Sequence, residues 1–180
     1  MKLNPKIGIL TPALMHWSPN QDERPAGSGI SLLVIHGISL PPGQYGGQWI
    51  EDLFMNRLDS SAHPYFMEIE GMKVSAHLLI RRDGEIIQYV PFVARAWHAG
   101  QSCFQGRDCC NDFSIGIELE GQDDEPYSNM QYQALNKLIP VLREAYPDIV
   151  SDNIVGHSYI APDRKTDPGP AFEWQRLNLI

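Results

Sequence analysis

The sequence has few cysteines, and their arrangement does not suggest disulfides. The three are Cys103, Cys109 and Cys110 in a chain of 180 residues. An odd number with two neighbours adjacent is a poor disulfide framework, so reduced thiols in a cytosolic protein are the simpler interpretation. The spacing also lacks the paired CxxC pattern of structural zinc sites.

Basic residues and long apolar runs are scarce as well. Lys and Arg total 14 against 22 Asp and Glu, which gives a net charge of −8. This balance argues against nucleic-acid binding and against electrostatic attachment to anionic membranes. No run is long enough to cross a bilayer. The N-terminal apolar cluster is interrupted at Gly8, Thr11 and Pro12, so we expect no signal peptide and a cytoplasmic location.

The length and a hydrophobic content of 43% fit one soluble domain with a substantial core. Residues 1–29 are rich in Pro, Gly and polar residues, and we predict an N-terminal arm packed on a domain of residues 30–180. Within that domain, the run ISLLVI at 30–35 indicates a strand covered on both faces and ending at His36. Apolar residues alternate with polar or small residues over 113–121, which indicates another strand. On it, Ser114, Gly116, Glu118 and Glu120 share one face.

The remaining patterns supply a hairpin and helices. Two β-rich runs at about 74–81 and 85–90 flank Asp83-Gly84, a favoured tight turn. The apolar residues that follow residue 48 have the spacing of one face of a helix. A second helix begins with a capping box of Ser128 and Gln131 and runs to about 146. Pro140 should kink or split this second helix. Residues 40–47 and 59–73 are predicted loops, and 172–180 a short helix. The order predicts a single α/β domain with a central mixed β-sheet flanked by helices.

The stretch HSYIAPDRKTDPGP at 157–170 gathers reactive side chains in a loop stiffened by three prolines. His157 and Asp167 are residue types that bind metals, and Lys165 lies two residues before Asp167. Rigid backbone around charged side chains points to a site rather than to a solvated surface. We interpret this loop as half of a metal site.

Other residues could complete the site, although each also has a structural explanation. His36, at the end of a buried strand, could be a ligand or a hydrogen-bonded core histidine. Glu118 could be a general base, because Gly116 leaves a gap beside it, or part of an exposed polar face. Trp97 and His98 could form a ligand-binding wall or simply pack. For His77, a buried structural role is favoured.

Together, His36, His157 and Asp167 form a reasonable three-ligand set for Zn²⁺, with a fourth position left for water. Glu118 could then accept a proton from that water, and Lys165 could stabilise the oxyanion formed at a carbonyl. The chain has no HExxH motif, so these ligands would have to converge from distant positions.

The segments that carry these residues resemble the zinc-dependent N-acetylmuramoyl-L-alanine amidases, whose fold is shared with T7-type lysozyme and the peptidoglycan recognition proteins. They include LLVIHGISLPPGQYGG, VSAHLLIRRDGEIIQYVPF, RAWHAG, DFSIGIELEG and GHSYIAPDRKTDPGP, and they span residues 32–170. The resemblance implies zinc at His36, His157 and Asp167, with Glu118 and Lys165 as the catalytic pair. It also implies that Trp97 lies along the substrate groove, and we expect His98, Gly37 and Lys73 to contact substrate.

The implied reaction is hydrolysis of the amide between (1,6-anhydro-)N-acetylmuramic acid and L-Ala of a muropeptide. That reaction serves peptidoglycan recycling and restrains β-lactamase induction. We expect a cytoplasmic monomer with this small-molecule substrate and with no nucleic-acid or membrane partner. Gly37, Lys73 and Cys109 stand where the resemblance leads us to expect Asn, Arg and a basic residue.

Two alternatives remain open from the sequence. One is a module of the same fold that binds wall fragments without cutting them. The other is an amidase that acts on intact cell wall.

Overall fold

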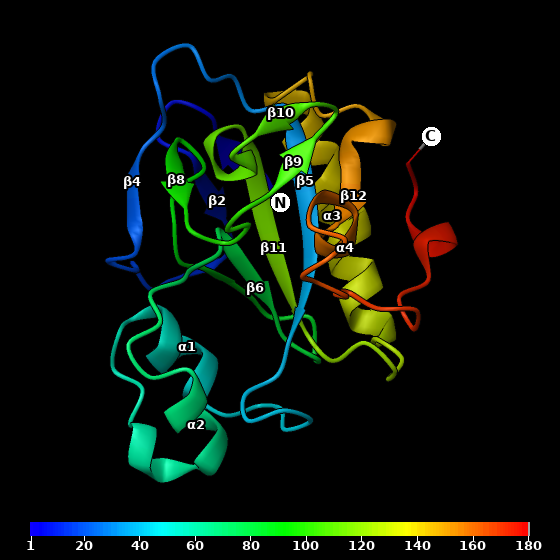
Figure 1. Ribbon diagram of the computed structural model, residues 1–180. Helices are drawn as coiled ribbons and strands as arrows, with labels where there is room; N and C mark the ends of the chain where they lie inside the picture. Colours follow the sequence, from blue (N-terminus) through cyan, green and yellow to red (C-terminus); the bar gives the residue numbers. More distant parts are fainter. Residues whose placement is uncertain (180) are drawn as a thin grey trace.

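A six-stranded mixed sheet forms the centre of the computed structural model, which describes residues 1–179 (Figure 1). The strand order is β12-β5-β11-β6-β7-β3. The strands β12, β5, β11 and β6 run parallel, β7 is antiparallel to β6, and β3 is parallel to β7. Their bounds are Leu14–Met15 (β3), Leu32–Ile38 (β5), Leu78–Ile80 (β6), Ile86–Gln88 (β7), Ser114–Glu120 (β11) and Ile154–Gly156 (β12).

Helix α3 (Asn129–Ala145) covers one face of this sheet. Its buried stripe includes Leu135, Leu138 and Leu142, which pack with Leu33 and Ile35 of β5. The capping box of Ser128 and Gln131 is present. Pro140 lies inside a helix that continues to Ala145, so of the two predicted effects the split is wrong, and the kink stays a prediction. The α/β fold predicted from the element order is confirmed.

The opposite face of the sheet is covered by several smaller elements. Helices α1 (Trp49–Phe54) and α2 (Pro64–Glu68) lie together beyond one end of the sheet (Figure 1) and pack with Leu79 and Ile87. The hairpin of β9 (Cys103–Phe104) and β10 (Arg107–Asp108) and helix α4 (His157–Ile160) cover Leu32 and Val34. Strand β5 is therefore buried on both faces, as its apolar run predicts.

Residues 1–29 contribute strands of their own. β1 (Lys2–Asn4) pairs with β2 (Ile9–Thr11), β3 extends the main sheet, and β4 (Gln21–Glu23) pairs with β8 (Ala94–Ala96). The division of the chain at residue 29 stays a prediction. No helix among residues 1–179 is both long and apolar enough to cross a membrane.

The structure corrects several predicted boundaries. Strand β5 continues to Ile38, so His36 lies within the strand, and the hairpin strands are shorter than predicted. The predicted loop at 59–73 contains helix α2, which begins at Pro64 and is too short to show helical periodicity. The C-terminal segment forms only a 3₁₀ turn at Trp174–Arg176, and residue 180 lies outside the described residues. Further 3₁₀ turns occur at Ser60–Ala62, Cys110–Asp112 and Ser151–Asn153.

Candidate active site

The register of three parallel strands brings the predicted site together. Glu118 of β11 is paired with His36 of the neighbouring β5, so their side chains lie side by side on one face of the sheet. On the other side of β5, Gly156 of β12 is paired with Ile35, and His157 follows directly. The three groups therefore lie near the carboxyl ends of adjacent parallel strands, where α/β sheets commonly bind ligands.

Three side-chain atoms converge as a metal site requires. His36 Nδ1 lies 3.0 Å from His157 Nδ1 and 3.1 Å from Asp167 Oδ2, and the last two atoms are 3.2 Å apart. Ligand atoms about 2.0–2.1 Å from a tetrahedral ion are about 3.3 Å from one another. Among residues 1–179, this is the group of three His, Cys, Asp or Glu side chains close enough to share an ion.

The far side of each imidazole is held by the protein. His157 Nε2 lies 3.1 Å from the Ala99 carbonyl oxygen and must carry a hydrogen to donate to it. His36 Nε2 lies 2.9 Å from His98 Nδ1. Burial lowers the pKa of His36 to about 4, and the neighbouring Asp167 only partly opposes this shift. The ring is therefore neutral near pH 7, which is the form that binds a metal.

The carboxyl group of Glu118, the candidate base, lies in a largely buried environment. Its Oε2 atom is buried and has no hydrogen-bond partner among the described residues. Burial raises the pKa of its carboxyl well above the ordinary value, Asp167 adds to the shift, and Lys165 opposes it. A raised pKa makes the carboxylate a stronger base, which suits it to accept a proton.

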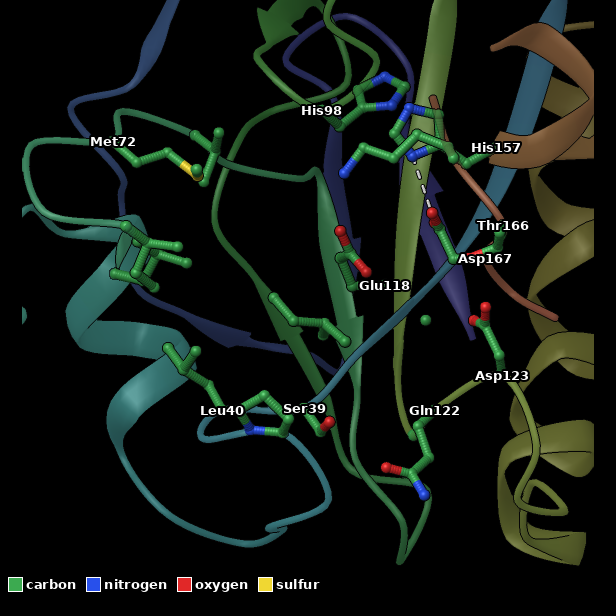
Figure 2. A pocket seen from close by; sticks show the side chains of 18 of the residues that line it. Ser39, Leu40, Met72, His98, Glu118, Gln122, Asp123, His157, Thr166 and Asp167 are labelled. Carbon is green, nitrogen blue, oxygen red and sulfur yellow. Dashed lines mark hydrogen bonds and ion pairs between the residues drawn. The ribbon is translucent and has the colours of Figure 1, made fainter. Parts of the chain in front are cut away.

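A cavity of about 780 Å³ opens over these residues. Figure 2 shows Glu118 near its middle, His98 and His157 at one end, and Met72 and Leu40 across from Asp123, Thr166 and Asp167. The wall with Leu40 and Met72 is largely apolar, whereas the wall with Asp123 is polar. The volume lies in the range of small-molecule sites, about 300–1,000 Å³.

The structure distributes the other predicted site residues unevenly. Lys165 and Gly37 line the same cavity as Glu118. Lys73 lines a smaller adjoining hollow of about 260 Å³, which shares Met72 with the main cavity. Trp97 is half-buried, and its main chain is hydrogen-bonded to Ser75, which lines the main cavity. Substrate contacts by these residues stay predictions.

His98 also lines the main cavity, and its contact with substrate stays a prediction. It is 8% exposed, and its two ring nitrogens face His36 and Ser114 rather than open space. The gap at Gly116 was expected to admit something beside Glu118, but the His98 ring fills it. A Cβ atom at Gly116 would lie 2.4 Å from His98 Cγ. His77 is buried, and its Nδ1 accepts a hydrogen bond from Gly116 N, which agrees with the favoured structural role.

Sequence reasoning missed the outer contacts of the site. The carboxamide of Asn111 accepts hydrogen bonds from the main-chain amides of His98 and Ala99, and Arg164 donates to the Ala99 carbonyl. No periodicity marks these residues, because they lie in loops and in the short 3₁₀ turn Cys110–Asp112. Ser114 was on the correct face of its strand, and this was the one local signal for its contact with His98.

Comparison with known proteins identifies the class of enzyme that this fold and site define. Residues 26–170 match the family model described as N-acetylmuramoyl-L-alanine amidase, and the chain belongs to that family. It is 59% identical over 163 residues to the 1,6-anhydro-N-acetylmuramyl-L-alanine amidase AmpD of Escherichia coli strain K12, covering 91% of this chain and 88% of that protein. AmpD of Haemophilus influenzae is 55% identical over 169 residues, 94% of this chain and 92% of that protein.

Solved structures agree with this assignment. A crystal structure of a selenomethionine AmpD derivative has a TM-score of 0.94 at 56% identity, covering 98% of this chain and 97% of that chain. The Escherichia coli amidase AmiD, in complex with anhydro-N-acetylmuramic acid-L-Ala-D-γ-Glu-L-Lys, has a TM-score of 0.59 at 32% identity and covers 86% of this chain and 59% of that chain. The predicted resemblance to this amidase family is confirmed.

Proposed function

We propose that the protein is a zinc-dependent amidase that cleaves the amide between 1,6-anhydro-N-acetylmuramic acid and the L-Ala of a muropeptide. The observation that carries this proposal is the convergence of His36, His157 and Asp167, with Glu118 beside them in one cavity. The family and the similarity to AmpD proteins support the reaction.

The donor set suits zinc. Two neutral imidazoles and one carboxylate are typical of zinc sites that hydrolyse amides, and three protein ligands leave one position for water. Bound zinc would supply Lewis-acid activation of that water and of the scissile carbonyl. The short separations between the three ligand atoms fit an ion of this size.

Proton transfer falls to Glu118. As a carboxylate it would accept a proton from the attacking water, and it would later deliver that proton to the departing amino group of L-Ala. The Lys165 ammonium, in the same cavity, would stabilise the negative charge that develops on the carbonyl oxygen. Burial raises the pKa of the Glu118 carboxyl, which makes its carboxylate a stronger base for the first transfer.

The cellular role follows from the substrate. Cleavage of anhydromuropeptides would serve peptidoglycan recycling and would restrain β-lactamase induction by keeping these fragments scarce. We propose that the protein acts as a cytoplasmic monomer and that Trp97, Lys73 and Gly37 contribute to substrate binding.

Metal content and turnover, measured together, test the assignment of roles. His157→Ala should lose both zinc and activity. Glu118→Gln should retain zinc and lose at least about 100-fold in kcat, because the base is removed while the ligands remain. Lys165→Met should also retain zinc, with a large loss of kcat and little change in KM.

Different results would overturn the proposal. Full activity in protein stripped of zinc would contradict the metal assignment. Loss of zinc from Glu118→Gln would make Glu118 a ligand. Zinc-loaded protein that binds muropeptides without cutting them would be a recognition module instead.

A further inference from the structure

We infer that His98 is a positioning residue for the metal site, because it accepts a hydrogen bond from His36 and thereby fixes which nitrogen of His36 faces the ion. The inference rests on the proposed metal site. It assigns to His98 a role different from the substrate contact expected from the sequence.

The evidence begins with a chain of three side chains that leads away from the metal site. His36 Nδ1 faces His157 and Asp167, and its other nitrogen, Nε2, lies 2.9 Å from His98 Nδ1. His98 Nε2 lies 3.0 Å from Ser114 Oγ. The two rings of His36 and His98 meet edge to face, with centroids 5.0 Å apart.

The direction of both hydrogen bonds follows from the assignment of His36 Nδ1 as the metal ligand. If His36 Nδ1 gives its lone pair to a metal, the neutral ring carries its hydrogen on Nε2. His98 Nδ1 must then be the acceptor, so the hydrogen of His98 is on Nε2 and is donated to Ser114 Oγ. A hydrogen on His98 Nδ1 would face the hydrogen on His36 Nε2. The arrangement therefore admits one tautomer for each ring.

His98 itself is held firmly. Its ring fills the space left by the missing side chain of Gly116, and its main-chain amide donates to Asn111 Oδ1 over 3.1 Å. The next residue, Ala99, donates to the same Asn111 oxygen over 2.8 Å, and its carbonyl accepts from His157 Nε2. Residues 98 and 99, both anchored by Asn111, thus supply the outer partners of both metal-binding histidines. Such outer partners commonly change metal affinity by about 10–100-fold.

Three variants separate hydrogen bonding from packing. His98→Leu removes the hydrogen-bond acceptor, while the leucine side chain still fills much of the space of the ring. We expect the zinc affinity of this variant to fall by about 10–100-fold. His98→Asn offers an amide oxygen near the position of Nδ1, and it should recover most of that loss. Ser114→Ala removes only the distant partner and should cause a smaller loss than His98→Leu. Zinc dissociation constants would come from competition with a chromophoric chelator, and the melting temperature of metal-free protein would be recorded for each variant.

A second measurement needs no variant. Nitrogen-15 NMR of the zinc-loaded wild-type protein reports the tautomer of each histidine, and we expect His98 to carry its hydrogen on Nε2. A hydrogen on Nδ1 would overturn the inference. So would His98→Leu protein that binds zinc as tightly as the wild type, or a melting temperature that falls while zinc affinity is unchanged. If the wild-type protein binds no zinc, the proposed function itself fails, which is a distinct result.

Discussion

Gly37 directly follows the proposed metal ligand His36, and the Tyr127 hydroxyl occupies the space that a side chain at this position would need. A Cβ atom at this position would lie 2.2 Å from Tyr127 Oη. The Tyr127 ring is buried, and its hydroxyl donates to the Pro168 carbonyl over 3.0 Å. The glycine therefore lets Tyr127 tie the metal-binding loop to strand β5. The resemblance led us to expect Asn here, and the packing explains why a larger residue does not fit this arrangement.

Gly37→Ala should destabilise the protein by about 1–3 kcal/mol, because the new methyl group overlaps the Tyr127 hydroxyl. In a Tyr127→Phe background most of that cost should disappear, because the ring carbon Cζ is 3.5 Å from the added Cβ, an ordinary contact. Urea unfolding of the four proteins in this double-mutant cycle measures the coupling.

Gly29→Ala is the matched control, since no atom lies within 4 Å of a Cβ at that position, and it should be nearly neutral. An equal cost of Gly37→Ala in both backgrounds would refute the proposed contact.

At the scale of elements, the buried Glu120 at the end of β11 holds the loop that forms one wall of the cavity. Its Oε1 accepts from Gly46 N over 2.6 Å and from Arg81 Nη1 over 3.1 Å. Arg81 also donates to the Gly47 carbonyl, and Arg82 N donates to Glu120 Oε2. Earlier residues of the same loop, Ser39, Leu40 and Pro42, line the cavity. The alternation of β11 placed Glu120 on the same face as Glu118, but it gave no sign of these contacts with the loop.

Glu120→Gln should loosen residues 43–47, because the neutral amide leaves Arg81 without its carboxylate and weakens the bond to Gly46 N. We expect faster hydrogen exchange at Gly46 and a rise of several-fold in KM, with kcat changed less, since the reacting groups are untouched. Glu68→Gln makes the same chemical change on an exposed position of α2 and should alter neither. Unchanged exchange at Gly46 in Glu120→Gln would show that the carboxylate does not hold this loop.

The elements that sequence predicted well are those with a strong local pattern. The alternation in β11, the apolar run of β5 and the capping box of α3 were each visible within one segment. The pairing of β5 with β11 and β12 was not visible, because register depends on contacts between distant segments. The candidate ligands could therefore be named from residue type and from the family resemblance. Their convergence, and the roles of His98, Ala99 and Glu120, required the fold.

At the scale of the whole molecule, the N-terminal segment reaches into the interior behind the active site. The guanidinium of Arg24 donates to main-chain carbonyls of Phe92, Asn111, Asp112 and Ser114, and Nη2 lies 3.0 Å from His77 Nε2. His77 is fully buried. Its burial is the main cause that lowers its pKa well below 6.5, and the charge of Arg24 is the second. Nearby His36 lowers it further, while the Ala94 carbonyl opposes the shift.

This buried histidine should make metal-free protein less stable in mild acid. Between pH 6.5 and the lowered pKa, the unfolded chain binds a proton that folded His77 does not, so the free energy of unfolding falls as the pH falls. The loss is at most about 1.4 kcal/mol per pH unit for one group. Glu118, whose pKa is raised, acts in the opposite sense, so the raw pH dependence does not isolate His77.

Comparison with His77→Gln isolates the histidine, because glutamine does not titrate. Urea unfolding at pH 7.0 and 5.5, in the presence of a chelator, should show a larger loss of stability for the wild type than for the variant. An equal loss in both proteins would mean that His77 does not titrate differently in the folded and unfolded states.

The most direct test of the central claim is product analysis by mass spectrometry. The purified protein would be incubated with anhydro-N-acetylmuramyl-tripeptide and, separately, with intact sacculi, each with and without a zinc chelator. We predict release of free tripeptide from the soluble substrate, abolished by the chelator and restored by added zinc. Release that persists after zinc is removed, or no release by protein shown to contain zinc, would contradict the proposed zinc amidase.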